Sequence, residues 1–283
     1  MKSLLHWRVA RPPLKIEHGV SYYGNVGTLS QPSEGAATTV GNYALFGGGS
    51  NYSEVIATTV DAYSASLVKS NPTNLSKKRR FLAATTVGNY ALFGGGLIDR
   101  ADATVDAYST SLVRSTPTSL SRARDNLAAT TVGNYALFGG GFEAYKDNVN
   151  TVDAYSASLV RRTLTGLSQA REYLAATTVG NYALFGGGAS SLFDMSSVVD
   201  AYSTSLVRST PTSLSQTRQE LAATTVGNYA LFGGGRTQGE TRYSVVDAYS
   251  SASLVRSTPT GLSQARNDLT ATTVGNTTVG DYA

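Results

Sequence analysis

The chain has 283 residues, a net charge of +4, and a composition that is 41% hydrophobic and 15% charged. This hydrophobic share is enough for a packed core and excludes a chain that is disordered throughout. Cysteine is absent, which excludes disulfides, cysteine-ligated metals and a cysteine nucleophile. The two histidines, His6 and His18, precede the regular part of the chain, so a metal site would depend on carboxylates. We therefore expect neither a metal nor another cofactor.

Residues 1–35 form an atypical N-terminal segment. They carry basic residues but no apolar run of the length that a secretory signal peptide needs. The chain contains no stretch of 18 apolar residues, so we expect no membrane insertion and a location in the cytoplasm or on a virion or cell surface. The basic run at residues 77–80 is interpreted as a solvated loop, and we expect no nucleic-acid partner.

Repetition dominates the rest of the chain. The 13-residue string ATTVGNYALFGGG occurs five times without change, starting at Ala37, Ala84, Ala129, Ala176 and Ala223. A second string, VDAYS, also occurs five times, starting at Val60, Val105, Val152, Val199 and Val246. A fixed period in this range indicates a repeat architecture. We divide the repeats into units at about 36–81, 82–126, 127–173, 174–220 and 221–268, with a partial unit at 269–283.

Each unit contains four strand-like runs, which in the second unit are residues 82–87, 90–93, 104–108 and 112–115. Gly88-Asn89 is typical of a two-residue hairpin turn, and Pro117 ends the fourth run. The first two runs are apolar or small on both faces, as expected of strands between neighbouring sheets. Because one small sheet cannot bury both faces alone, the pattern predicts an all-β protein with four-stranded blades stacked around an axis, a β-propeller.

One unit carries the residues of a known family in order. They are Arg124, Leu127, the run 135–140 (YALFGG), the run 152–155 (VDAY), Leu167 and Arg171. This pattern resembles a Kelch repeat, and the resemblance covers about residues 36–275. It implies a Kelch-like propeller, most similar to divergent bacterial or phage-encoded members. The usual tryptophan after the tyrosine is missing, and a leucine lies near its place in every unit: Leu67, Leu112, Leu159, Leu206 and Leu254.

The two ends leave the number of blades open. Residues 270–276 restart a unit, but the chain ends before another LFGGG string, and residues 28–31 resemble the end of a unit. One hypothesis is a six-bladed ring whose last blade joins inner strands from the C-terminus to outer strands from residues 1–35. The alternative is a truncated fragment whose ring does not close, which would leave strand edges exposed.

The least repetitive residues are expected on one face of the propeller, in the loops after each GGG and in the links between units. Loops on a rigid scaffold often carry recognition residues. The loop aromatics and charges are the candidate ligand-binding residues: Tyr52, Glu54, Arg100, Asp102, Glu143, Tyr145, Lys146, Phe193, Asp194, Arg236, Glu240, Arg242 and Tyr243. The link dipeptides on the same face vary too; they are Arg80-Phe81, Asp125-Asn126, Glu172-Tyr173, Gln219-Glu220 and Asn267-Asp268.

Two charged positions recur in every unit. The aspartates are Asp61, Asp106, Asp153, Asp200 and Asp247, and we align with them the arginines Arg80, Arg124, Arg171, Arg218 and Arg266. Five copies at one position favour a structural role, either hydrogen bonds to turns or pairing between the two sets. A ring of arginines binding an anionic sugar is the less favoured interpretation.

These observations favour a non-catalytic scaffold, a monomer that recognises a protein or a surface glycan through the variable loops. A Kelch-type enzyme is the first alternative. The residues do not fit the copper oxidases of this fold, since cysteine is absent, but a sialic-acid isomerase would need only acidic and arginine residues. The second alternative is a truncated repeat-expansion product without a specific activity.

Overall fold

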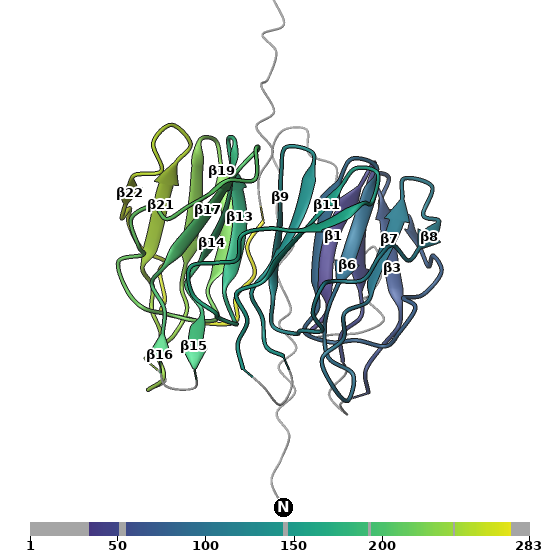
Figure 1. Ribbon diagram of the computed structural model, residues 1–283, viewed down its shortest axis with the longest axis horizontal. Helices are drawn as coiled ribbons and strands as arrows, with labels where there is room; N and C mark the ends of the chain where they lie inside the picture. Colours follow the sequence, from purple (N-terminus) through teal and green to yellow (C-terminus); the bar gives the residue numbers. More distant parts are fainter. Residues whose placement is uncertain (1–33, 51–54, 144–146, 192–193, 240, 273–283) are drawn as a thin grey trace, which may run out of the picture.

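The computed structural model describes residues 34–50, 55–143, 147–191, 194–239 and 241–272. These residues form five four-stranded antiparallel sheets and one two-stranded sheet, and no helix occurs among them. The expectation of an all-β protein with four-stranded blades is therefore confirmed. The arrangement is that of a β-propeller-like repeat, with successive sheets side by side (Figure 1).

The first two sheets have their strands in sequence order. The first sheet consists of β1 (Ala36–Val40), β2 (Tyr43–Gly47), β3 (Val60–Ser64) and β4 (Lys69–Ser70). The second consists of β5 (Ala83–Val87), β6 (Tyr90–Gly94), β7 (Val105–Ser109) and β8 (Arg114–Ser115).

The remaining sheets repeat this order. The third sheet consists of β9 (Ala128–Val132), β10 (Tyr135–Gly139), β11 (Val152–Ser156) and β12 (Arg161–Thr163). The fourth consists of β13 (Ala175–Val179), β14 (Tyr182–Gly186), β17 (Val199–Ser203) and β18 (Arg208–Ser209). The fifth consists of β19 (Ala222–Val226), β20 (Tyr229–Gly233), β21 (Val246–Ser250) and β22 (Arg256–Ser257). A short hairpin, β15 (Ala189–Ser191) with β16 (Asp194–Met195), follows the fourth GGG.

The second sheet shows why the repeated sequence forms these strands. Val87 pairs with Tyr90 across the Gly88-Asn89 turn, where Gly88 has a positive φ of 52°, so the predicted hairpin is confirmed. The fourth strand is shorter than expected and begins at Arg114. Leu112 instead lies in the turn with a φ of 60°, and the Ser109 hydroxyl accepts a hydrogen bond from Val113 N at 3.2 Å.

Successive sheets pack face to face through aromatic side chains and glycines. The Phe93 ring lies where a Cβ on Gly47 of the preceding sheet would approach it at 2.9 Å, so only glycine fits there. Phe93 also packs edge-to-face with Tyr108, with ring centroids 5.9 Å apart. The Tyr108 hydroxyl donates to the carbonyl of Thr73 in the preceding unit at 2.7 Å. Equivalent contacts recur in the third to fifth sheets.

A buried ion pair crosses each boundary between described sheets. Arg124, at the end of the second unit, donates from Nη2 to Asp153 Oδ2 in the third sheet at 3.0 Å, and neither side chain is exposed. The guanidinium also donates to the carbonyls of Thr151 and Phe138. Burial lowers the pKa of Arg124 to about 10, and the charge of Asp153 opposes that shift. The arginine therefore stays charged at neutral pH.

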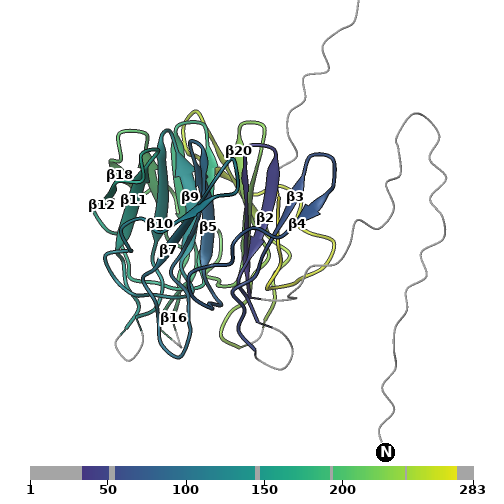
Figure 2. The same ribbon diagram turned by 90° about the vertical axis from the view of Figure 1, so that its right-hand side faces the viewer.

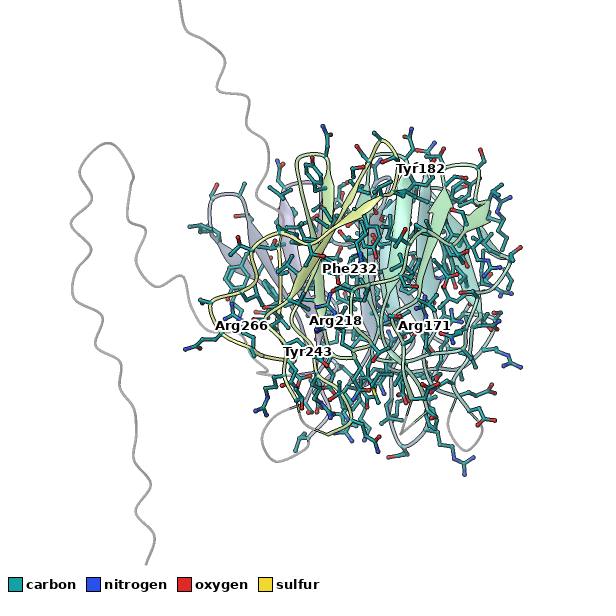
Figure 3. The ribbon with its side chains drawn as sticks, turned by 90° about the vertical axis from the view of Figure 1, so that its left-hand side faces the viewer. Arg171, Tyr182, Arg218, Phe232, Tyr243 and Arg266 are labelled. Carbon is teal, nitrogen blue, oxygen red and sulfur yellow. The ribbon has the colours of Figure 1, made fainter. Side chains whose placement is uncertain are left out.

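The other boundaries carry the same pair. They are Arg79 with Asp106, Arg171 with Asp200 and Arg218 with Asp247. The expected structural pairing is thus confirmed at four boundaries, with one correction to the alignment. The first-unit arginine is Arg79, because it lies 19 residues after Val60, as Arg124 lies 19 residues after Val105. Arg80 lies one residue further on, where it pairs with Glu34 at 3.3 Å. Figure 3 shows Arg171 and Arg218 within the body of the molecule and Arg266 at its edge.

The first strands of successive sheets pack against one another in the order β1, β5, β9, β13 and β19. Threonine hydroxyls join them, as in the 2.8 Å contact between Thr85 and Thr131. Main-chain hydrogen bonds also run from unit to unit through one positive-φ residue in each link, at Glu34, Phe81, Asn126, Tyr173, Glu220 and Asp268. The first strands therefore line the axis, as the small side chains of the AATTV run predict.

In the described part of the chain, the first and fifth sheets each have one face that no neighbouring sheet covers. The reason is that β19 does not pack against β1 in the way that the other first strands pack against one another. On the fifth sheet Val226 is 50% exposed, although its counterparts in the other sheets are buried. The first sheet, with β2, β3 and β4, lies at one side of the molecule in Figure 2. Its residue Phe46 is 36% exposed. The residues proposed to complete a sixth blade, 1–33 and 273–283, lie outside the described residues.

Replacement of Asp153 by Asn tests the buried ion pair. The variant leaves the Arg124 guanidinium enclosed without its counter-charge, so we expect it to lose about 3–5 kcal/mol of unfolding free energy in urea denaturation. Arg161→Ala is the matched control, since Arg161 is the partly exposed second partner of the same carboxylate at 3.1 Å. That variant should lose about 1 kcal/mol or less. Equal losses would contradict a dominant role for the buried pair.

Candidate functional site

A cavity of about 670 Å³ opens on the face that carries the loops and links. Its described lining is aromatic, acidic and amide-rich, and comes from three links and three loops: Phe81, Leu97, Asp125, Asn126, Phe142, Asp147, Asn148, Glu172, Tyr173, Ser190 and Ser191. A cavity of this size with a few convergent polar groups is the usual form of a ligand site. It lies where the units differ most in sequence, so it is the candidate site.

Two positions in each link place the lining side chains. The first position pairs its main chain with the first residue of the loop after GGG, as Asp125 does with Phe142 and Glu172 with Ala189. The second position has the positive φ described above and turns the chain around the axis, as at Asn126. Because these contacts use only main-chain atoms, the side chains are free to differ from unit to unit.

Asp125 and Glu172 meet in this cavity from neighbouring links. The Asn126 side-chain amide donates to Asp125 Oδ1 at 2.8 Å and to Glu172 Oε2 at 3.1 Å, so one nitrogen joins the two carboxylates. Asp125 is only 4% exposed. Within the described residues, neither carboxylate has an ion-pair partner within 4 Å.

Burial raises the pKa of the Asp125 carboxyl to about 6, and the nearby Glu172 adds to the shift. Burial likewise raises the pKa of Glu172, although the hydrogen bond from Asn126 opposes the change. The pKa of Tyr173 is raised to about 12 by burial and by the Glu172 charge. The site therefore holds carboxylates that the fold makes costly to ionise, which is a frequent property of functional sites.

Two other link carboxylates are paired with arginines. Glu220 accepts hydrogen bonds from Arg236 Nε at 2.5 Å and from Asn267 at 2.7 Å. Burial acts to raise the pKa of Glu220, but these donors outweigh it and leave the pKa below its usual value. Glu34 similarly pairs with Arg80. The lack of a described counter-charge thus distinguishes Asp125 and Glu172 from these neighbours.

The structure describes seven of the thirteen loop residues predicted to bind a ligand, and none of the seven lines this cavity. Asp102 is buried, where it accepts from Lys77 at 2.7 Å and from Thr104 N at 2.6 Å and so orders its own loop. Glu143 pairs with Arg122 at 3.3 Å, and Asp194 accepts from the Ser190 hydroxyl.

The remaining predicted residues lie elsewhere on the loop face. Arg236 holds Glu220, Arg242 donates to Asn267 at 2.7 Å, Arg100 is exposed and Tyr243 is half-buried. The other six lie outside the described residues: Tyr52, Glu54, Tyr145, Lys146, Phe193 and Glu240. The link residues were recognised as variable in the sequence but were not among those thirteen. The signal that could have selected them is a pair of acidic residues, Asp125 and Glu172, at one repeat position.

The described residues contain no group of three or more His, Cys, Asp or Glu side chains suited to hold a metal ion. No helix that they form is long and apolar enough to cross a membrane. A scan against protein-family models and a search of curated proteins found no match to this chain.

The raised pKa of Asp125 predicts a specific pH dependence of stability. The folded state binds this proton more tightly than the unfolded state, so the group lowers stability as pH rises from about 4 to about 6. Asp125→Asn should be near neutral at pH 4 and should stabilise the protein by roughly 1–2 kcal/mol at pH 8, allowing for solvent screening. Thermal or urea unfolding at the two pH values measures this difference.

Asp102→Asn is the control with the opposite sign. Lys77 and Thr104 outweigh the burial that would raise the Asp102 pKa and hold that pKa below its usual value. The Asp102 variant should therefore be about equally destabilising at pH 8 and pH 4, because the stabilising charge of Asp102 is lost only as pH falls below about 4. The same pH dependence in both variants would contradict the assignment of an uncompensated charge to Asp125.

Proposed function

We propose that this protein is a non-catalytic binding scaffold that recognises a protein or a surface glycan on the loop face of a divergent, bacterial or phage-type Kelch-like propeller. The observation that carries the proposal is the position of the cavity. The strands are almost identical from unit to unit, whereas the cavity is lined by link and loop residues that differ in each. Variation confined to a concave surface on a uniform scaffold is typical of recognition sites.

The architecture in this proposal has six blades. Leu269 packs against Gly234 in the way that Leu127 packs against Gly95, and Asp268 N bonds to Glu220 O as in the preceding links. These contacts support the start of a sixth unit at residue 269. Residues 273–283 and 1–33 would then supply its inner and outer strands and cover the exposed Phe46 and Val226.

The enzyme alternative receives less support from the site. A sialic-acid substrate is anionic, but the described lining of the cavity has three acidic residues and no cationic side chain. The repeated arginines that could have bound such a sugar are buried in ion pairs at four boundaries. A repeat-expansion product without activity would give no reason to keep the buried carboxylates Asp125 and Glu172, since the fourth unit has the neutral Gln219 at the same repeat position.

A binding screen with two surface variants tests the proposed function. Immobilised glycans and short peptides are probed with the full chain, with Tyr173→Ala on the cavity wall, and with Val160→Ser. Val160 is the control because it is an exposed residue of the turn before β12, on the opposite face. We expect binding to at least one ligand class that the Tyr173 variant loses by about tenfold and the Val160 variant retains. Binding that both variants retain, or no binding to either library, would contradict the proposal.

A further inference from the structure

The cavity has three features that together select one kind of ligand group: uncompensated carboxylates, aromatic walls and a bridging amide. We propose that it binds the ammonium or guanidinium group of a lysine or arginine side chain presented by a partner protein. This inference rests on the proposed function, since it names the ligand of the same site.

Charge is the first argument. Asp125 and Glu172 face the cavity beside one shared Asn126 nitrogen, and Asp147 lies at its rim. The chain as a whole has a net charge of +4, so the acidic lining is a local feature. A carboxylate removed from water is stabilised by an opposite charge that also donates hydrogen bonds, which ammonium and guanidinium groups both do.

The aromatic walls are the second argument. Phe81, Phe142 and Tyr173 line the same cavity as the carboxylates. An aromatic face attracts a cation within about 6 Å of its centroid. The structure already contains such a contact next to the site, with the Arg80 guanidinium 5.1 Å from the Phe81 ring centroid. The aliphatic part of a lysine or arginine side chain would also lie favourably against Leu97 and these rings.

Two described cations around the site have partners of their own. Arg80 is the nearest described cation; it pairs with Glu34 and also acts on Asp125 to lower its pKa. Arg236, in the loop of the fifth unit, is held by Glu220. Neither forms an ion pair with Asp125 or Glu172. A metal ion is a poorer occupant, because the described residues offer no group of three suitable ligands.

The fourth unit supplies the matched variant. Gln219 occupies the position of Asp125 and Glu172, with the same main-chain pairing, there to Arg236, and it is buried. The fold therefore accepts a neutral amide at this position. The double variant Asp125→Asn with Glu172→Gln should fold and should lose the two carboxylate charges beside Asn126, while Asp147 remains.

The experiment measures binding of three capped peptides to the full chain by calorimetry or NMR. The probes are Ac-Gly-Lys-Gly-NH2, Ac-Gly-Arg-Gly-NH2 and the neutral Ac-Gly-norleucine-Gly-NH2. We expect the two cationic peptides to bind at least about tenfold more tightly than the norleucine peptide, and the double variant to lose that preference. Glu143→Gln, which alters a carboxylate outside the cavity lining, should keep it.

The pH dependence adds a second readout. Because the pKa of Asp125 is raised to about 6, its negative charge is lost at lower pH, so binding of the cationic peptides should strengthen between pH 5 and pH 7. Peptide charge does not change over this range. The double variant should show no such change.

The outcomes separate this inference from the proposed function. Equal binding of the lysine and norleucine peptides, or equal binding by wild type and double variant, overturns the cationic ligand. If a neutral glycan binds and Tyr173→Ala abolishes that binding, the scaffold function stands and the cationic ligand falls. If no peptide or glycan depends on the cavity residues, both fall.

Discussion

The structure depends on a buried ion pair that each unit can form only with its neighbour. The arginine follows the fourth strand of one unit and the aspartate lies in the third strand of the next, as with Arg124 and Asp153. An enclosed charge without its partner is strongly destabilising, so neither half of the pair is tolerable in an isolated unit. The glycine that receives the next phenylalanine and the carbonyl that receives the next tyrosine hydroxyl add the same dependence. Units of this kind must therefore stack, and a uniform sequence at these positions is the physical requirement for stacking.

The same requirement explains where variation is allowed. The links are held by main-chain pairing and by a positive φ, so their side chains can differ from unit to unit, although some also pair between links, as Arg80 does with Glu34. The side chains at link positions can therefore suit a ligand even where they lower the free energy of unfolding. Asp125 and Glu172 illustrate that cost, because burial raises the pKa of both, whereas Gln219 at the same position carries no charge. A binding role would explain why buried carboxylates and aromatic side chains line one cavity on the loop face.

The sequence was sufficient to predict the strands, the Gly-Asn turns and the order of each sheet, because these follow from local periodicity repeated five times. It was not sufficient to place Leu112 in a turn, since a leucine with positive φ is held there by its surroundings. The repeat spacing does identify Arg79 as the buried arginine, since it lies 19 residues after Val60 as Arg124 does after Val105, so the alignment of Arg80 was an error of register. The sequence did not predict the cavity, because the link residues that line it are far apart along the chain and only the curvature of the stack brings them together. Arg236 and Asp102 show that loop charges can hold the scaffold itself.

If every sheet requires a neighbour on both faces, the first sheet must be covered as the others are. The most direct measurement is the unfolding free energy of Phe46→Ala beside that of Phe93→Ala in the full chain. Phe93 is fully buried against the preceding sheet, and its loss should cost about 3–5 kcal/mol. Coverage of the first sheet by the chain ends predicts a comparable loss for Phe46→Ala. A loss of about 1 kcal/mol or less at Phe46, with the full loss at Phe93, would contradict it.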